Sequence, residues 1–511
     1  MVRSANSATS EHAMGPGIAC IINFIRGHEP RPHSPDLVEP VRQQLALLAR
    51  HGLRGTFLLQ HDALDARFLD LLCDTHHELG AWFEVTQSLC ERIGLPWRGR
   101  YSWDWHAHVG MTVGYTPAQR ILLADALLDD VQTATGRPVR SVGAWYLDAV
   151  TLSHLASRGV IASCNCKDQL GTDGYSLWGG PWNHGYRPSR RHALMPGRGD
   201  TDTIPLALFR MLGSDPLTQY EQGIGGIWQD VLTLEPVSAR CGGDPSWVRW
   251  FYDQNLGPQP LAFGWLQAGQ ENSFGWPAMT GLEFQFAELA RRAGHTTRIL
   301  TLAEAGDWFL TSFADSPACA VIAHDHPQQP RHGALWYHDQ RWRASLAWDG
   351  VAARIRDLHL FPTDHYEPNL HMPVPGPECV VDTPALIDGH RWSTAEQLHA
   401  LVVRDVKGTS LGRGRPTVRE GDQMLIATWD DGLHVICNPD GLTIRAPGTW
   451  YAELTWRTLD TAPVAPFAAG LVIRHEGRNW TVPLRGQALM QANGLKLSPS
   501  GDGVLVLGPM P

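Results

Sequence analysis

The 511-residue chain lacks the features that define several large functional classes. It carries 42 Lys and Arg against 52 Asp and Glu, so it has no excess of positive charge to hold a nucleic-acid backbone. No apolar run approaches the roughly 20 residues that span a bilayer, and the first fifteen residues are polar, without the apolar segment of a signal peptide. We therefore expect no nucleic-acid partner, no membrane partner and a cytoplasmic location.

The cysteines and the common short motifs also give little indication of function. The nine cysteines are odd in number and irregularly spaced, which fits reduced buried thiols better than a disulfide framework. Cys164 and Cys166 are separated by one residue and lack a second pair, so a structural role is favoured over zinc binding. The sequence contains no P-loop, no HExxH and no GxSxG motif.

Tryptophan, by contrast, is abundant, with 21 Trp beside 10 Tyr and 14 Phe. An indole ring offers a flat apolar face and one N–H donor, which suits the C–H faces of sugar rings, although Trp also fills protein cores. The composition therefore favours a carbohydrate ligand modestly.

The hydrophobic pattern divides the chain into three parts. Residues 1–15 are expected to be a disordered tail, and residues 16–318 alternate short apolar strands with amphipathic helices. Strands are predicted at 18–25, 55–59, 79–85, 139–145, 160–164, 204–212, 261–266 and 297–301, and helices at 37–51, 65–75, 117–135, 149–158, 277–293 and 303–313. Such units predict an α/β fold, a (β/α)7–8 TIM-like barrel, with its site at the carboxyl ends of the strands.

Residues 319–511 follow a different pattern, with alternating strands separated by turn dipeptides such as Asp349-Gly350 and Asp431-Gly432. Strands are predicted at 335–348, 424–427, 433–437, 450–455 and 470–474. A C-terminal β-sandwich domain follows from this pattern. Its role is left open between glycan binding, covering the barrel and a homodimer contact.

Two segments of the first half resemble a known family. His51-Gly-Leu-Arg-Gly-Thr-Phe-Leu-Leu59 and Thr135-Gly-Arg-Pro138 are similar to the second-strand and fourth-strand motifs of the polysaccharide-deacetylase (NodB-like) barrel, over roughly residues 18–165. In that family, paired aspartates follow strand one and an HxxxH pair follows strand three. Here the two positions contain Phe24-Ile-Arg-Gly27 and Phe83-Glu-Val-Thr-Gln87. The family's metal site is therefore missing from its usual place.

The order of barrel and β-domain is also similar to glycoside hydrolase family 156, a group of inverting exosialidases that use an Asp/His pair. This resemblance implies an exo-acting, metal-independent and inverting glycosidase without a cofactor, and it ranks sialosides first among the substrates. His106, within Trp103-Asp-Trp-His-Ala-His108, is the nearest match to the family's histidine. A hydrogen-bonded or surface role is the alternative for His106.

Glycoside cleavage normally needs two carboxyl groups, so acids at strand ends are the catalytic candidates. Glu29 follows the first strand, and Glu84 lies in an apolar strand where burial would raise its pKa; an ion pair is the alternative for each. Asp148 stands directly before a helix, so its alternative role is an N-cap. Glu271 lies among polar residues between two glycines, directly after a buried strand, and is the strongest of the four.

Substrate contacts are expected from tryptophans and polar groups near strand ends and in the long excursion 165–202, since long ordered loops at strand ends often line binding sites. Arg26 or Arg210 would clamp the carboxylate of an acidic sugar; a carboxylate of the protein is the alternative partner. The polar excursion residues could instead bind the loop to itself. The binding candidates are Arg26, Trp82, Trp105, Trp145, Asn165, Asp168, Gln169, Trp178, Asn183, Arg210, Gln270 and Asn272.

Three functions remain open from the sequence. The first is a glycoside hydrolase acting at the barrel mouth on a glycan. The second is a deacetylase whose metal site is displaced onto histidines such as His28, His106 or His108. The third is a non-catalytic carbohydrate-binding protein, in which the acids only bind sugar hydroxyls.

Overall fold

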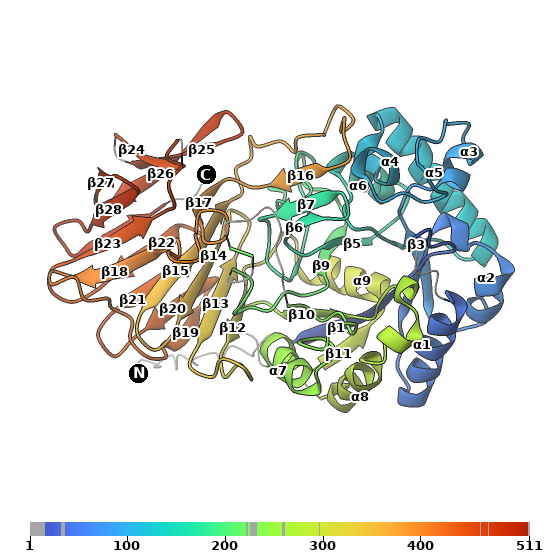
Figure 1. Ribbon diagram of the computed structural model, residues 1–511, viewed down its shortest axis with the longest axis horizontal. Coiled ribbons are helices and arrows are strands. Elements are labelled where there is room, and N and C mark those ends of the chain that lie inside the picture. The colour runs from blue at the N-terminus through green and yellow to red at the C-terminus, as the bar shows by residue number, and fades with distance from the viewer. Residues whose placement is uncertain are drawn as a thin grey trace, which may run out of the picture.

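The protein consists of an α/β barrel and an all-β block that lie side by side along its longest axis (Figure 1). This computed structural model describes residues 16–31, 36–220, 223–224, 232–257, 261–295, 297–459, 461–468 and 470–508. The expected tail, residues 1–15, lies outside the described residues. No helix in the described ranges is both long and apolar enough to cross a membrane.

The barrel is a nearly closed, mixed sheet, as the alternating pattern predicts. The strand order is β10 (Gly264–Ala268), β1 (Gly17–Ile25), β2 (Thr56–Leu59), β3 (Glu78–Trp82), β4 (Ser141–Gly143), β5 (Ala162–Cys166), β9 (Ala207–Met211) and β8 (Gly185–Tyr186), and β11 (Thr297–Leu300) also pairs with β1. The pairs are parallel except for β8 with β9. All nine residues of β1 are buried, because its two faces pack into two different cores.

Side chains close the gap between β9 and β10. Trp265 Nε1 donates to the carbonyl of Arg210 at 2.7 Å, and Gln267 Oε1 accepts from the Leu212 amide at 2.8 Å. These bonds satisfy backbone groups that a neighbouring strand would otherwise pair. The barrel is therefore sealed on this side without a continuous backbone ladder.

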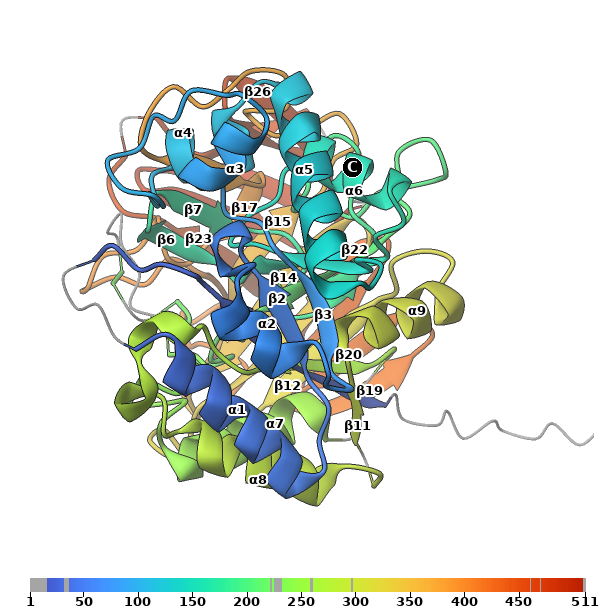
Figure 2. The ribbon, with the colours of Figure 1, turned by 90° about the vertical axis from the view of Figure 1, so that its right-hand side faces the viewer.

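Helices surround the strands on the outside (Figure 2). Six correspond to predicted helices: α1 (Val38–His51), α2 (Ala66–Leu72), α5 (Pro117–Thr135), α6 (Ala149–Ser157), α8 (Leu282–Arg292) and α9 (Leu302–Ser312). The short α3 (Gln87–Arg92) and α4 (Ala107–Gly110), and the longer α7 (Pro245–Leu256), were not predicted. Helix α5 begins with a capping box between Thr116 and Gln119 and ends at Gly136, which has φ 68°.

The all-β block contains two antiparallel sheets. One has the order β12 (Cys319–Ala323), β13 (Gly333–His338), β14 (Trp342–Trp348), β15 (Ala353–Leu360), β18 (Leu401–Asp405), β23 (Trp450–Thr455), β28 (Gly494–Ser498) and β27 (Gln487–Gln491), and β17 (Ala385–Asp388) pairs with β15. The other has the order β19 (Thr417–Gly421), β20 (Met424–Thr428), β21 (His434–Asn438), β22 (Gly441–Arg445), β29 (Val504–Leu507), β26 (Arg478–Arg485), β25 (Gly470–His475) and β24 (Val464–Phe467). Both sheets bury side chains in one shared core, which is the arrangement of a sandwich.

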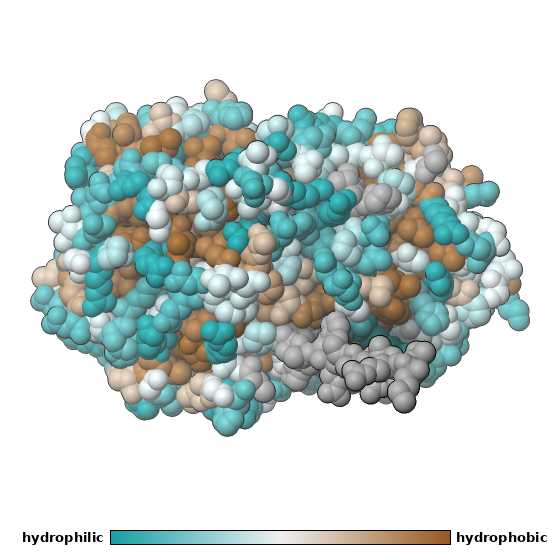
Figure 3. Space-filling view, turned by 180° about the vertical axis from the view of Figure 1, so that it is seen from behind, coloured by the Kyte–Doolittle hydropathy of each residue, from teal (hydrophilic) through white to brown (hydrophobic). Residues whose placement is uncertain are grey.

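A small third sheet joins the two blocks. Strands β6 (Gln169–Thr172) and β7 (Tyr175–Trp178) belong to the excursion after β5, and β7 pairs in parallel with β16 (Cys379–Asp382) from the C-terminal part. On the face opposite to that of Figure 1, hydrophilic side chains predominate and apolar ones occur in scattered patches over both blocks (Figure 3).

Two strand predictions need correction. The predicted strand 335–348 is two strands, β13 and β14, which form a hairpin. The predicted strand 79–85 ends at Trp82, although Phe83 and Val85 remain buried beyond it. The pattern of apolar residues therefore indicates which side chains are buried, and it continues after the backbone hydrogen bonds of the strand end.

Candidate active site

Three carboxylates surround one buried guanidinium at the carboxyl ends of the barrel strands. Arg26 directly follows β1 and is 1% exposed. Its Nε and Nη2 donate to Glu84 at 3.0 and 2.6 Å, and its Nη1 lies 2.8 Å from Glu271 Oε2 and 3.4 Å from Glu29 Oε2. Glu84 follows β3 and Glu271 follows β10, so separate strands bring the acids together. Arg26 thus lies at the centre of three acidic side chains and is their shared positive charge.

Glu84 acts purely as a hydrogen-bond acceptor. Besides the two bonds from Arg26, it accepts from Gln60 Nε2 at 2.6 Å and from Trp145 Nε1 at 2.7 Å. Gln60 directly follows β2 and Trp145 lies beyond β4, so five neighbouring strand ends contribute to the cluster. The prediction of Glu84 inside a strand was wrong, because this residue stands in the loop two residues after the strand ends.

Glu29 is held mainly by Arg31. Its carboxylate accepts from the Arg31 amide at 3.0 Å and from the Arg31 guanidinium at 2.8 and 2.9 Å. Burial opposes the charge, but the hydrogen bonds from Arg31 and the nearby charge of Arg26 outweigh it and lower the pKa of Glu29. Glu29 is therefore an ionised member of the cluster.

Glu271 lies in the opposite environment. Burial, reinforced by the charge of Glu84 and opposed by that of Arg26, raises the pKa of Glu271 to about 7. Its Oε2 is close to Arg26 but outside hydrogen-bond geometry, and it has no hydrogen-bond partner among the described residues. The Glu271 carboxyl group therefore keeps its proton to a higher pH than an ordinary glutamate does.

The loop that carries Glu271 is fixed to the first strand. Asn272 Oδ1 accepts from the Arg26 amide at 2.9 Å, and Asn272 Nδ2 donates to the carbonyls of Arg26 at 3.0 Å and Leu37 at 2.9 Å. The carbonyl of Gln270 accepts from Gln44 Nε2 at 2.9 Å. Asn272 and Gln270, predicted as substrate contacts, thus bind the chain itself and position Glu271.

A narrow cleft opens beside Glu84, with an aromatic lining. Its volume is about 10 Å³, room for little more than one water, and it is lined in part by Glu84, Trp103, Trp105, Trp145, Tyr146 and Asp173. The ring of Trp103 lies 4.0 Å from the Arg26 guanidinium and covers it. Trp82 instead stacks on Phe24 inside the barrel, with 4.4 Å between ring centres. Of the predicted tryptophans, Trp105 and Trp145 face the cleft and Trp82 does not.

Asp148 and His106 lie outside the cluster. Asp148 is the N-cap of α6 and accepts from Thr151, Thr112 and Arg120, so its oxygens are fully engaged. His106 Nδ1 lies 2.5 Å from Asp104 Oδ1, and its ring stacks on Trp105. Both contacts place His106 on the loop that covers the cleft rather than among the carboxylates.

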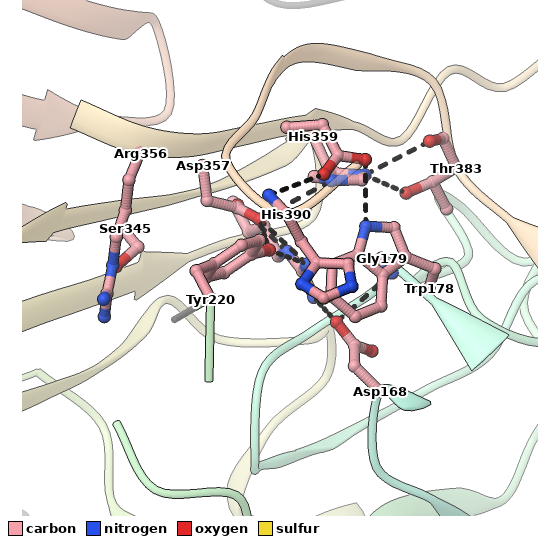
Figure 4. Close-up of polar contacts among 12 residues, drawn as sticks. Asp168, Trp178, Gly179, Tyr220, Ser345, Arg356, Asp357, His359, Thr383 and His390 are labelled. Atoms are coloured by element: carbon pink, nitrogen blue, oxygen red, sulfur yellow. Dashed lines mark hydrogen bonds and ion pairs between the residues drawn. The ribbon is translucent and has the colours of Figure 1, made fainter. Parts of the chain in front are cut away.

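The predicted contacts in the excursion are part of a buried network between the two blocks (Figure 4). Asp168 accepts from Arg210 at 2.7 Å and from Arg343 of β14 at 2.6 Å, and Trp178 Nε1 donates to Asp388 at 3.0 Å. A carboxylate of the protein is therefore the partner of Arg210.

Of the remaining polar candidates, two bind the excursion to the barrel segments beside it and one binds within the excursion. Asn165 exchanges two hydrogen bonds with the backbone of Leu147, and Asn183 exchanges two with that of Ser214. Gln169 donates to Tyr175 at 2.8 Å and accepts from Lys167 at 2.9 Å. Each of these amides is satisfied within the chain.

Gln60, Trp103 and Arg31 are site residues that were not predicted. Gln60 directly follows a predicted strand. Glu271 was selected because it is polar and follows a buried strand, and the same criterion identifies Gln60. Trp103 stands in the Trp-rich stretch beside Trp105, but nothing in its local pattern shows that it covers an arginine 77 positions earlier in the chain.

Comparison with known proteins gives the fold. No family model matches the chain, and no curated protein matches it. A solved structure from Parabacteroides distasonis, assigned only provisionally as a glycoside hydrolase/deacetylase, matches 74% of this chain and 92% of its own, with 16% identity and a TM-score of 0.56. A provisional polysaccharide deacetylase from Mycobacterium smegmatis matches 58% of this chain and 92% of its own, with 13% identity and a TM-score of 0.35.

The barrel has the polysaccharide-deacetylase (NodB-like) fold. In this NodB-like barrel, the positions after β1 and β3 hold Arg26 and Glu84. Across the described ranges, one group of at least three His, Cys, Asp or Glu side chains has the spacing of a metal site, and it is His365, His475 and Glu476 in the C-terminal part. His28, His106 and His108 do not belong to it, so the described residues do not form a displaced metal site on these histidines.

Proposed function

We propose that the protein is a glycoside hydrolase with its reaction centre at the barrel mouth, where Glu271 is the general acid and Glu84 the ionised partner. The observation that carries this proposal is that Glu84 and Glu271 contact the same guanidinium, that of Arg26, but lie in different environments. Glu271 has a pKa raised to about 7 and an oxygen without a hydrogen bond, whereas both oxygens of Glu84 accept from donors. Carboxyl groups in opposed environments are the usual division between acid and base in glycosidases.

Burial with a raised pKa alone does not identify the acid. Glu367 also has a pKa raised to about 7, by burial first and then by the charge of Asp148. However, Glu367 accepts from Tyr146 and from the amides of Ala149 and Ala193, so both its oxygens are bonded within the protein. Glu271 differs because its Oε2 contacts Arg26 without a hydrogen bond, so a leaving group that displaces this contact could take the proton.

Substrate entry requires the cleft to widen. Trp103 covers Arg26, and the cleft holds about one water, so the Trp103–Trp105 segment must move outward before a sugar reaches Glu271. The indole faces of Trp105 and Trp145 would then border the sugar. We expect Trp105→Ala to raise KM more than it lowers kcat.

The first substrate to test is a terminal acidic sugar such as a sialoside. Arg26 and Arg210 are both paired with acids of the protein, so neither is available as the predicted clamp. Arg31 is also paired, with Glu29, but a third of its side chain is exposed at the edge of the cluster, so it is the one of the three arginines that a substrate can reach.

The stereochemical course is a separate question. The family resemblance favours inversion, which uses carboxyl groups roughly 6.5–9.5 Å apart, whereas retention uses about 5–5.5 Å. Contact of Glu84 and Glu271 with one guanidinium favours the shorter spacing. Proton NMR of the first anomer released distinguishes the two courses.

The deciding experiment is a panel of aryl glycosides that includes an α-sialoside, assayed with and without EDTA. We expect one member to be cleaved in EDTA, with kcat/KM falling above about pH 7, where Glu271 loses its proton. Glu271→Gln and Glu84→Gln should each lower kcat at least 100-fold, and the exposed Glu283→Gln should leave it unchanged. Release of acetate from an acetylated glycan, abolished by EDTA and without sugar release, would instead establish a deacetylase.

A further inference from the structure

A second cluster of metal-ligand side chains lies far from the barrel mouth in the sequence. His365 follows β15, His475 is the last residue of β25, and Glu476 begins the turn into β26. One ligand atom from each of the three residues lies within 4.8 Å of the others. Two imidazoles and one carboxylate are a ligand set that zinc takes in proteins.

The two rings are oriented as metal-binding histidines usually are. His365 Nε2 lies 3.2 Å from the carbonyl of Asp382, which can only accept, so this nitrogen carries the proton and Nδ1 keeps its lone pair. His475 Nε2 lies 3.1 Å from the carboxylate of the same residue, although outside hydrogen-bond geometry. Metal-binding histidines typically direct the other ring nitrogen to a carbonyl or a carboxylate in this way.

A neighbouring histidine shows the contrast. His192 also donates from Nε2 to the Asp382 carbonyl, at 3.1 Å, but its Nδ1 accepts from the Leu194 amide at 3.2 Å. Both of its ring nitrogens are therefore occupied. No hydrogen bond reaches Nδ1 of His365 from the residues that the structure describes.

Glu476 completes the set with a carboxylate that lacks a donor. Within the described ranges it makes neither a hydrogen bond nor an ion pair. The nearby cations are engaged elsewhere, since Arg391 pairs with Asp382 and Arg478 donates to the Asp364 carbonyl. A bound cation would supply the positively charged partner that this carboxylate lacks.

The scaffold around the cluster is fixed, and one side of it is open. Trp480 Nε1 donates to Asp364 at 3.0 Å, and the Glu367 amide donates to the Arg191 carbonyl at 2.9 Å, so both ends of the His365 loop are anchored. A cavity of about 370 Å³ adjoins the cluster and is lined in part by His365, Glu476 and Arg478.

We propose that His365, His475 and Glu476 bind one Zn²⁺ ion, with Asp382 orienting both histidines and the fourth coordination position facing this cavity. The ion would connect the loop after β15 to the turn between β25 and β26. This zinc site shares no residue with the barrel mouth, so the proposal does not depend on the glycosidase assignment.

The test is zinc binding by the untagged full-length protein after exhaustive dialysis against EDTA and removal of the chelator. Titration with ZnCl2 against a zinc-chelating dye should show one tight equivalent per chain, and Co²⁺ in its place should give the visible absorption of a tetrahedral site. His475→Gln and Glu476→Gln should each weaken binding at least tenfold, and zinc should raise the Tm of the wild type but not of either variant.

His371→Gln is the matched control, because His371 is an exposed histidine lining the same cavity. It should bind zinc as the wild type does. Glu476 is also exposed, so Glu476→Gln is expected to fold, and circular dichroism checks this for each variant. The proposal is overturned if the wild type binds no tight equivalent, if folded Glu476→Gln binds as tightly as the wild type, or if His371→Gln loses binding equally.

Discussion

At the scale of single residues, the protonation of the acids at the barrel mouth depends on the number of arginines relative to carboxylates around Arg26. One buried guanidinium serves Glu84, Glu271 and Glu29, and Arg31 shares only the last of them. Two arginines cannot neutralise three carboxylates, so the acid with the fewest hydrogen bonds takes up a proton most readily. Glu271 is that acid, because Glu84 and Glu29 receive donors from several residues.

This imbalance predicts how stability depends on pH. The pKa of Glu271 is about 7 in the folded protein against an ordinary 4.5, so the folded state binds the proton more tightly than the unfolded state does. The stabilisation from the neutral side chain is complete below about pH 4.5 and is lost as pH rises through 7. Glu271→Gln should therefore gain about 1–3 kcal/mol over the wild type between pH 4.5 and pH 8.

Urea unfolding of both proteins at the two pH values measures this difference. The exposed Glu283→Gln is the control and should track the wild type at both values. Equal stability differences for Glu271→Gln at pH 4.5 and pH 8 would contradict the raised pKa.

At the scale of elements, the loop between β10 and Asn272 decides where the proposed acid stands. Gly269 has φ +96°, and a Cβ there would lie 2.3 Å from the carbonyl oxygen of Ile22 in β1. Only glycine permits both the backbone conformation and the close approach of the two strands. The position of Glu271, two residues later, therefore depends on this glycine.

Gly269→Ala should destabilise the protein by about 2–4 kcal/mol and lower kcat, because the loop must shift away from β1. Gly52→Ala is the matched variant: Gly52 has φ +62° with nothing within 4 Å of an added Cβ, so it should cost only about 1 kcal/mol and leave kcat unchanged. Thermal melts and kcat of both variants test the comparison, and equal effects at the two positions would refute the role of the contact.

The elements also show what a sequence can and cannot specify here. The barrel strands other than β8, and six helices, follow from the apolar pattern, because it reports which positions are buried. The end of β3 does not, since Phe83 and Val85 are still buried after the ladder ends. Helix α7 was missed although Asp244 caps it and Pro245 occupies its first turn, which are both readable signals.

At the scale of the whole molecule, the two blocks are joined by buried charges rather than by apolar contact alone. Arg343 of β14 donates to Asp168 of the excursion and to Asp357 of β15, and the Tyr220 hydroxyl accepts from Arg343 and donates to Asp357. Local sequence shows that Arg210 needs a carboxylate. It does not show which one, because Asp168 is shared with an arginine 175 positions away. Partners at such separations depend on the packing of the blocks, which periodicity does not encode.

The network predicts that the blocks depend on Arg343 for their stability. Its side chain is fully buried between Asp168 and Asp357, and burial, opposed by Arg343, raises the pKa of Asp357 to about 6. Arg343→Met would leave Asp357 buried without its arginine and Asp168 with Arg210 alone, and should lower the free energy of unfolding by about 3–5 kcal/mol. Arg354→Met, which removes a partly exposed arginine 3.6 Å from Asp349, should cost at most about 1 kcal/mol.

Adding Asp357→Asn to Arg343→Met should recover part of the lost stability, because the uncompensated charge is then removed while the shape of the side chain is kept. Asp168 is left unchanged because it still pairs with Arg210. Urea unfolding followed by tryptophan fluorescence measures all three proteins. A double variant less stable than Arg343→Met would mean that the network acts through hydrogen-bond geometry. An Arg343→Met variant no less stable than Arg354→Met would mean that the blocks are held together by the β7–β16 pairing and apolar contacts instead.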